Sequence, residues 1–303
     1  MAKGILFSGQ GAQQVGMGHE VYEKNPIAKK LWDQANDILG FDLKQICFNG
    51  PEDQLTQTKI CQPALYVHGY ALYQVLKLED VRVASGLSLG ELTAHAAAGT
   101  YDFETGLRIV AERGRLMQEA CEASNGSMAS VIGGKIEDIE ILCERNDVQI
   151  ANLNSPGQVV ISGDKQKIEA AIADAANFEF KRVIPLNVAG AYHSRLMLPA
   201  CKPFESFLAN IEFKQPRMPV FSNTTGADIS EPAKIKEALV KQIVSSVRWE
   251  ECMLNAAKLG VSEFYECGPG KVLKGLAKRI DPNISVHSVN NYEDISSICA
   301  QTV

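Results

Sequence analysis

The chain has 303 residues, of which 46% are hydrophobic and 22% charged, a composition typical of a globular protein whose length favours two compact units. The formal net charge of −6 argues against a general nucleic-acid-binding protein, and no apolar run is long enough to span a membrane. The eight cysteines include no C-x-x-C pair, which argues against a zinc ribbon or a thioredoxin-type site.

The first segment, "MAKGILFSGQG", has an apolar run of only three residues, so we expect no signal peptide. Isolated cysteines in a chain without such a signal are typical of small buried side chains in a reducing compartment. We therefore expect a cytoplasmic protein with no metal site.

Strand-like and helix-like segments alternate in the first part of the chain. We expect strands at residues 3–8 and 81–85, and helices at 28–39, at 64–76 and directly after Ser88. This alternation favours an α/β sheet with helices on its faces.

The pattern changes after residue 122. A strand at 127–134, a helix at 136–146, two strands within 149–163, a helix at 165–177 and a strand at 181–190 give the order β-α-β-β-α-β of a ferredoxin-like unit. We expect residues 123–190 to form an inserted domain, and residues 1–122 with 191–303 to form the larger domain. Further strands are expected at 218–223 and 261–268, and a cleft between two such units is a usual ligand site.

A G-x-S-x-G sequence, Gly86 to Gly90, separates the strand at 81–85 from the following helix. A serine at such a strand-to-helix turn is typical of a nucleophile elbow, in which the glycines allow a sharp turn. The same sequence also occurs in ordinary glycine-rich turns. Its position between a strand and a helix favours Ser88 as a nucleophile.

A serine nucleophile needs a general base. The chain has five histidines: His19, His68, His95, His193 and His287. His95 lies seven residues along the helix from Ser88, about 10 Å away, so we expect it on the helix face. His287 lies in a strand-like alternation and is expected to be structural. His193 directly follows an apolar strand, where catalytic side chains collect in open α/β sheets, and is the favoured base.

Acyl transfer also needs hydrogen-bond donors for the oxyanion. The backbone N–H of Leu89, after the nucleophile, is one candidate. The glycine-rich loop around Gln10 is the second, against the alternative of a plain glycine turn. It is no dinucleotide fingerprint, because Gln14 stands where the third glycine would be required.

The expected helix over residues 103–120 has a charged face with spacings of four, three and four, formed by Arg108, Glu112, Arg115 and Glu119. Arg113 instead falls on the apolar side with Ile109 and Leu116. A buried guanidinium needs an anion, and two alternatives are open. Arg113 forms an internal salt bridge, or it binds the carboxylate of a substrate.

These features together resemble the malonyl-CoA:acyl carrier protein transacylases, over almost the whole chain. The matching segments, in order, are "FSGQGAQQVGMG", "QPALY", "GLSLGE", "RGRLMQ", "NLNSPGQVVISG", "AYHSRLM", "VRW" and "ECGPGKVL". The resemblance implies an α/β-hydrolase-like large domain with an inserted ferredoxin-like small domain.

It also implies roles for individual residues. Ser88 would carry the malonyl group and His193 would act as its general base and acid. Arg113 would pair with the malonyl carboxylate. The backbone N–H groups of Gln10 and Leu89 would form the oxyanion hole. The backbone carbonyl of Gln242 would orient His193. After CoA leaves, the phosphopantetheine thiol of an acyl carrier protein would attack the acyl-serine, and no cofactor is required.

The chain departs from the family at two positions. Leu87 stands where histidine is usual, and Ser8 where proline is common. Leu87 removes a polar group beside the elbow, which puts the rate and the acyl preference in question but not the activity.

Carrier proteins are acidic, so a docking surface should be basic. Lys181 and Arg182, at the start of the last strand of the inserted domain, are the expected docking residues. Lys271, Lys274 and Lys278 form a second basic set, for which a solvated charged stripe is an equal alternative. We expect a monomer.

The predicted function is malonyl transfer, in fatty-acid synthesis or in trans in polyketide synthesis. Two other functions are alternatives. An acyl hydrolase acting on carrier proteins would share the serine and the histidine but would need no carboxylate clamp, so Arg113 argues against it. A non-catalytic carrier-binding module is disfavoured because both Ser88 and His193 are present.

Overall fold

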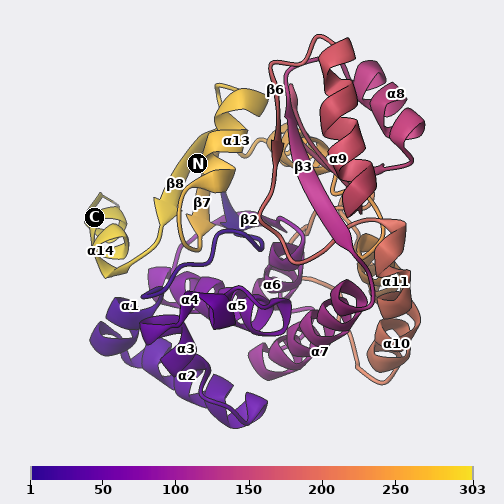
Figure 1. Ribbon diagram of the computed structural model, residues 1–303. Coiled ribbons are helices and arrows are strands. Elements are labelled where there is room, and N and C mark those ends of the chain that lie inside the picture. Colours follow the sequence, from indigo (N-terminus) through magenta and orange to yellow (C-terminus); the bar gives the residue numbers. More distant parts are fainter. Residues whose placement is uncertain (1, 302–303) are drawn as a thin grey trace.

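The computed structural model describes residues 2–301 and contains two β-sheets with helices packed around them (Figure 1). The first sheet has four parallel strands in the order β2-β1-β7-β8: β1 (Lys3–Phe7), β2 (Val81–Gly86), β7 (Glu263–Cys267) and β8 (Ser285–Val289). Phe7, the last residue of β1, pairs with the last residues of both β2 and β7. The loops that leave these three strands therefore start side by side at one edge of the sheet.

The second sheet is antiparallel, with the order β4-β5-β3-β6. Its strands are β3 (Gly126–Ile132), β4 (Gln149–Ser155), β5 (Gln158–Asp164) and β6 (Arg182–Pro185), and its helices are α8 (Ile136–Asn146) and α9 (Lys165–Asp174). The sheet and both helices share a small core of their own, which includes Val131, Leu142 and Ile168. The mixed α/β class expected from the sequence is confirmed.

The other helices surround the first sheet and the space between the sheets (Figure 1). They are α1 (His19–Lys24), α2 (Pro26–Leu39), α3 (Leu43–Asn49), α4 (Glu52–Leu55), α5 (Thr58–Leu76), α6 (Leu89–Ala97), α7 (Phe103–Glu122), α10 (Leu198–Ala209), α11 (Pro232–Gln242), α12 (Trp249–Lys258), α13 (Val272–Ile280) and α14 (Tyr292–Gln301). Short 3₁₀ turns occur at Ala175–Asn177 and Arg195–Met197. Helix α5 starts six residues before the expected residue 64, because the sequence pattern is interrupted by Pro63, which the helix accommodates.

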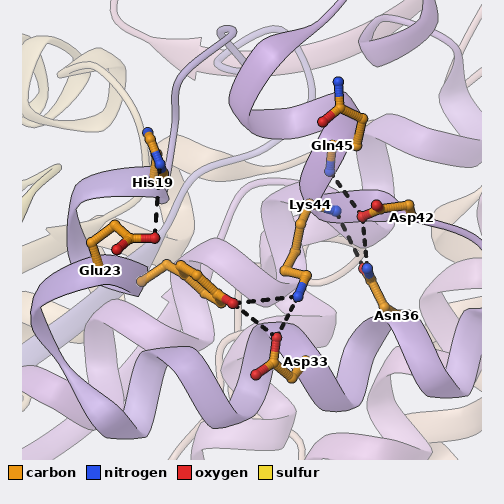
Figure 2. Close-up of polar contacts among 8 residues, drawn as sticks. His19, Glu23, Asp33, Asn36, Asp42, Lys44 and Gln45 are labelled. Atoms are coloured by element: carbon orange, nitrogen blue, oxygen red, sulfur yellow. Dashed lines mark hydrogen bonds and ion pairs between the residues drawn. The ribbon is translucent and has the colours of Figure 1, made fainter.

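Polar contacts join the first helices to one another (Figure 2). Lys44 of α3 bonds to the Asp33 carboxylate of α2, which also accepts from the Tyr22 hydroxyl of α1 at 3.1 Å. Asp42 caps α3 by accepting from the Gln45 N–H at 3.0 Å, as Figure 2 shows. This helical layer packs on α5, the long helix behind the site.

The expected strand at residues 218–223 is wrong as a regular strand. Val220 forms only an isolated parallel bridge with Ala84 of β2, and Phe221 forms only an isolated antiparallel bridge with Asp228. Pro219 lacks an N–H to donate, and from Ser222 the backbone turns back on itself, since the Gly226 N–H bonds to the Ser222 carbonyl at 2.8 Å. The segment thus ends beside the carboxyl end of β2.

Backbone contacts connect the second sheet to the rest of the chain. The N–H of Leu153 in β4 donates to the Val247 carbonyl at 2.8 Å, and the Val247 N–H donates to Ala151 at 2.8 Å. The Arg195 guanidinium also bonds to both carboxylate oxygens of Asp147 at 2.6 Å.

No helix within residues 2–301 is long and apolar enough to cross a membrane.

Candidate active site

Ser88 lies at the turn between β2 and α6, and the two glycines around it are required by close packing. A Cβ atom on Gly86 would lie 2.0 Å from the carbonyl carbon of Gly90, and one on Gly90 would lie 2.2 Å from the Phe7 oxygen. Ser88 itself has φ 53° and ψ −102°, a conformation that L-residues rarely adopt. The elbow therefore holds the Ser88 backbone in a strained conformation.

His193 is hydrogen-bonded to the serine. Its Nε2 lies 2.9 Å from Ser88 Oγ, and its Nδ1 lies 2.8 Å from the Gln242 carbonyl oxygen. Because a carbonyl can only accept, Nδ1 carries the proton and Nε2 is free to accept from the serine hydroxyl. Burial and the Arg113 charge lower the pKa of His193 to about 4, so the ring is neutral at pH 7.

Arg113 lies behind Ser88 and is buried. Its Nη1 donates to Gln62 Oε1 at 2.7 Å, and its Nη2 donates to Gln242 Oε1 at 2.7 Å and to Ser88 Oγ at 3.1 Å. Burial lowers the pKa of Arg113 to about 10, and the guanidinium stays charged at pH 7. No ion pair within residues 2–301 includes Arg113, so the salt-bridge alternative left open by the sequence does not describe its contacts. A buried cation held by neutral groups is suited to an incoming anion.

A cleft of about 440 Å³ opens above Ser88 and His193. One wall comes from loops of the first sheet and from helix α7, and includes Gln10, Leu87 and Met117. The other wall comes from the second sheet and the chain that leaves it, and includes Met128, Val160 and Leu186. Leu87, one of the two departures from the family pattern, lines this cleft and takes no part in the hydrogen bond between Ser88 and His193.

The two oxyanion candidates lie at the same edge of the first sheet. Leu89 is the first residue of α6, so its N–H has no acceptor within the helix. The loop carrying Gln10 packs on the elbow so closely that a Cβ on Gly9 would lie 2.4 Å from the Leu87 oxygen. The Gln10 side chain donates to Tyr192 Oη at 3.1 Å, which ties the loop to the residue before His193.

Two buried residues at the site were missed by the sequence reasoning. Glu91 accepts at Oε2 from Gln242 Nε2 at 2.6 Å and from the Asn223 N–H at 2.9 Å, and burial raises its pKa to about 7. Asn223 accepts from the Ser88 N–H at 2.6 Å and donates to the Gly86 carbonyl at 2.9 Å. A glutamate in a first helical turn normally indicates a favourable interaction with the helix dipole, so no local signal marks Glu91 as buried.

The remaining expectations lie outside this cluster. His95 lies in α6, which is buried along its whole length, and its Nδ1 lies 3.1 Å from Thr100 Oγ1. His287 stacks on Tyr265 in the first sheet.

Lys181 and Arg182 are exposed and do not line the cleft. Strand β6, which starts at Arg182, is followed directly by the segment 186–189, which does line it. Within residues 2–301 no group of three or more histidine, cysteine, aspartate or glutamate side chains could hold a metal ion.

The chain is similar to known proteins over nearly its full length. Residues 5–289 match the family model described as the acyl transferase domain. The chain is 39% identical to the malonyl CoA-acyl carrier protein transacylase of Bacillus subtilis, covering 96% of this chain and 94% of that protein. It is 42% identical to the polyketide biosynthesis malonyl CoA-acyl carrier protein transacylase PksC of the same organism, covering 91% and 96%.

Solved structures agree with the sequence relatives. The crystal structure of an acyl carrier protein S-malonyltransferase from Vibrio cholerae superposes with a TM-score of 0.94 at 38% identity, covering 98% of this chain and all of that one.

Proposed function

Because the chain belongs to the acyl transferase domain family, and within it to the malonyl CoA-acyl carrier protein transacylases, we propose that it moves a malonyl group from malonyl-CoA to the phosphopantetheine thiol of an acyl carrier protein. It is an acyltransferase, and its place is in fatty-acid or trans-acting polyketide synthesis. The observation that carries the proposal is the buried Arg113 cation directly behind a serine that is hydrogen-bonded to a neutral histidine.

In the first half-reaction, Ser88 Oγ attacks the thioester carbonyl carbon while His193 Nε2 takes the hydroxyl proton. The N–H groups of Gln10 and Leu89 stabilise the oxyanion. The carbon–sulfur bond then breaks, His193 returns the proton to the CoA sulfur, and the malonyl group remains as an ester on Ser88. In the second half-reaction His193 takes the proton of the carrier thiol, whose sulfur attacks the ester. Collapse of that intermediate releases Ser88, which regains the proton.

Arg113 supplies the preference for a malonyl group. Its Nη2, which faces Ser88 Oγ at 3.1 Å, is placed to pair with a carboxylate carried by the acyl group. An acyl hydrolase acting on carrier proteins is the alternative function. It would gain nothing from such a cation, so the contacts of Arg113 favour the transferase.

Intact-protein mass spectrometry tests the function. The protein is mixed with malonyl-CoA or acetyl-CoA, beside a Ser88→Ala control, and acyl carrier protein is then added. We expect a malonyl adduct that is absent from the control and moves to the carrier. Release of free malonate without transfer to the carrier would support the hydrolase instead.

The low pKa of His193 predicts the acid limb of the rate profile. The imidazole accepts a proton only in its neutral form, and its pKa is lowered to about 4, so kcat/KM for adduct formation should hold steady as the pH falls to about 5 and decline near 4. A decline centred near pH 6.5, the ordinary value for histidine, would contradict this environment for His193. Glu91, whose pKa is about 7, also lies at the site, so the profile is repeated with Glu91→Gln to separate the two groups.

Charge reversal at the exposed Lys181 and Arg182 tests the docking surface. We expect Lys181→Glu with Arg182→Glu to raise the KM for carrier protein about tenfold, and to leave the formation of the malonyl adduct unchanged. The matched control reverses Lys29 and Lys30, which are exposed on α2 and alter the net charge equally. Equal loss of both half-reactions would argue against docking at this strand.

The finer organisation is part of the same proposal. The parallel sheet with the serine elbow at its edge supports an α/β-hydrolase-like large domain of residues 1–122 and 191–303, and the strand order β4-β5-β3-β6 supports a ferredoxin-like insertion at 123–190. All eight cysteines are free, which supports a cytoplasmic location. We propose a monomer, which sedimentation would test.

A further inference from the structure

The side chain of Gln242 makes contacts that the mechanism does not require. Its backbone carbonyl faces His193, while its side-chain amide lies between three groups of the site. Oε1 accepts from Arg113 Nη2 at 2.7 Å, and Nε2 donates to the Ser88 carbonyl at 3.0 Å and to Glu91 Oε2 at 2.6 Å. One residue at the end of α11 therefore contacts the base, the nucleophile and the arginine.

The orientation of this amide matters for Arg113. If the amide turned by half a rotation, its NH₂ group would face the Arg113 N–H donors, and its oxygen would face the oxygens of Ser88 and Glu91. Three hydrogen bonds would become three repulsive contacts. Glu91 provides the shortest of the three, so it contributes strongly to the observed orientation.

Glu91 is itself fixed. Helix α6 is buried around it, its Oε2 also accepts from the Asn223 N–H at 2.9 Å, and its Oε1 has no hydrogen-bond partner within residues 2–301. A carboxylate bonded directly to Arg113 would occupy the guanidinium and compete with a carboxylate on the substrate. Placing one amide between them gives Arg113 an acceptor at Nη2 without such competition.

We propose that Glu91 is a positioning residue for the acyl preference: by accepting from Nε2 of Gln242, it holds the amide oxygen toward Arg113 and so keeps the guanidinium aligned for the substrate carboxylate. This inference rests on the proposed function, in which Arg113 binds the malonyl carboxylate. The acetyl group lacks that carboxylate, so its transfer does not depend on the alignment.

The test measures adduct formation from malonyl-CoA and from acetyl-CoA in Glu91→Met and Glu91→Gln. Methionine has a similar length but accepts no strong hydrogen bond, whereas glutamine keeps an oxygen for both donors. We expect Glu91→Met to lower the ratio of malonyl to acetyl rates about tenfold, and Glu91→Gln to keep it within about twofold. The ratio does not depend on the fraction of folded protein, so a general loss of stability would not move it.

Two results would overturn the proposal. An unchanged ratio in Glu91→Met, with both rates lowered equally, would mean that Glu91 is only structural. A loss in Glu91→Gln as large as in Glu91→Met would mean that its role is not that of an acceptor.

A double-mutant cycle with Gln242→Met tests whether Glu91 acts on the ratio of malonyl to acetyl rates through Gln242. If Glu91 acts through Gln242, the two substitutions together should lower the ratio no further than Gln242→Met alone. If Glu91→Met does not fold, Gln242→Met by itself must lower the ratio about tenfold, and an unchanged ratio contradicts the proposal. Failure of the wild type to form any malonyl adduct would instead contradict the proposed function.

Discussion

Replacing His193 by alanine is expected to slow the formation of the malonyl adduct by about 10⁴-fold or more, although Ser88 is untouched. A serine hydroxyl is a weak nucleophile unless a base takes its proton, and His193 Nε2 is the acceptor within hydrogen-bond distance of Ser88 Oγ. The other partner of that oxygen, Arg113, is a donor and cannot replace the base. The rate is measured by rapid quenching and intact-protein mass.

Two controls make this result interpretable. His287→Ala, on a strand of the first sheet away from the cleft, should keep the wild-type rate. Ser88→Ala should form no adduct, which shows that the adduct whose rate is measured is the ester on Ser88. A loss of less than about tenfold in His193→Ala would show that another group acts as the base.

The alternation of apolar segments was sufficient to predict the strands of both sheets. Apolar residues recur with different periods in strands and in helices, and a short strand needs little further signal in the sequence. The segment at 218–223 was apolar enough to look like a strand. Only the structure shows that Pro219 and the turn from Ser222 leave it with isolated bridges. Strand pairing is a property of two segments, so a pattern in one of them is not decisive.

The site residues also differ in how well the local sequence identifies them. Ser88 is marked by the glycines around it, and the structure gives the reason, since neither glycine has room for a Cβ. Gln242 has no local mark in "LVKQIV" and was assigned only by family resemblance, because its contact with His193 spans 49 residues. Glu91 was missed because burial of a charged side chain depends on α11 and on the segment at Asn223, which come much later in the chain.

Arg113→Ala is expected to separate the two acyl donors. The ion pair in question is the one proposed between Arg113 and the malonyl carboxylate. Removing one partner of a buried ion pair costs about 3–5 kcal/mol, so adduct formation from malonyl-CoA should fall roughly 10²- to 5 × 10³-fold, while the rate with acetyl-CoA should change less than about tenfold. Arg113→Lys should recover only part of the malonyl rate, because an ammonium cannot replace the planar group that bonds to Gln62 and Gln242 at once.

The two donors distinguish a clamp from a structural role. Loss of the guanidinium leaves the Gln62 and Gln242 amides without their buried donor, so some loss of thermal stability is expected in both variants. That loss lowers both rates together through the fraction of folded protein, whereas loss of the clamp lowers only the malonyl rate. Equal losses for malonyl-CoA and acetyl-CoA would therefore remove Arg113 as the source of the preference, and with it the strongest argument against a hydrolase.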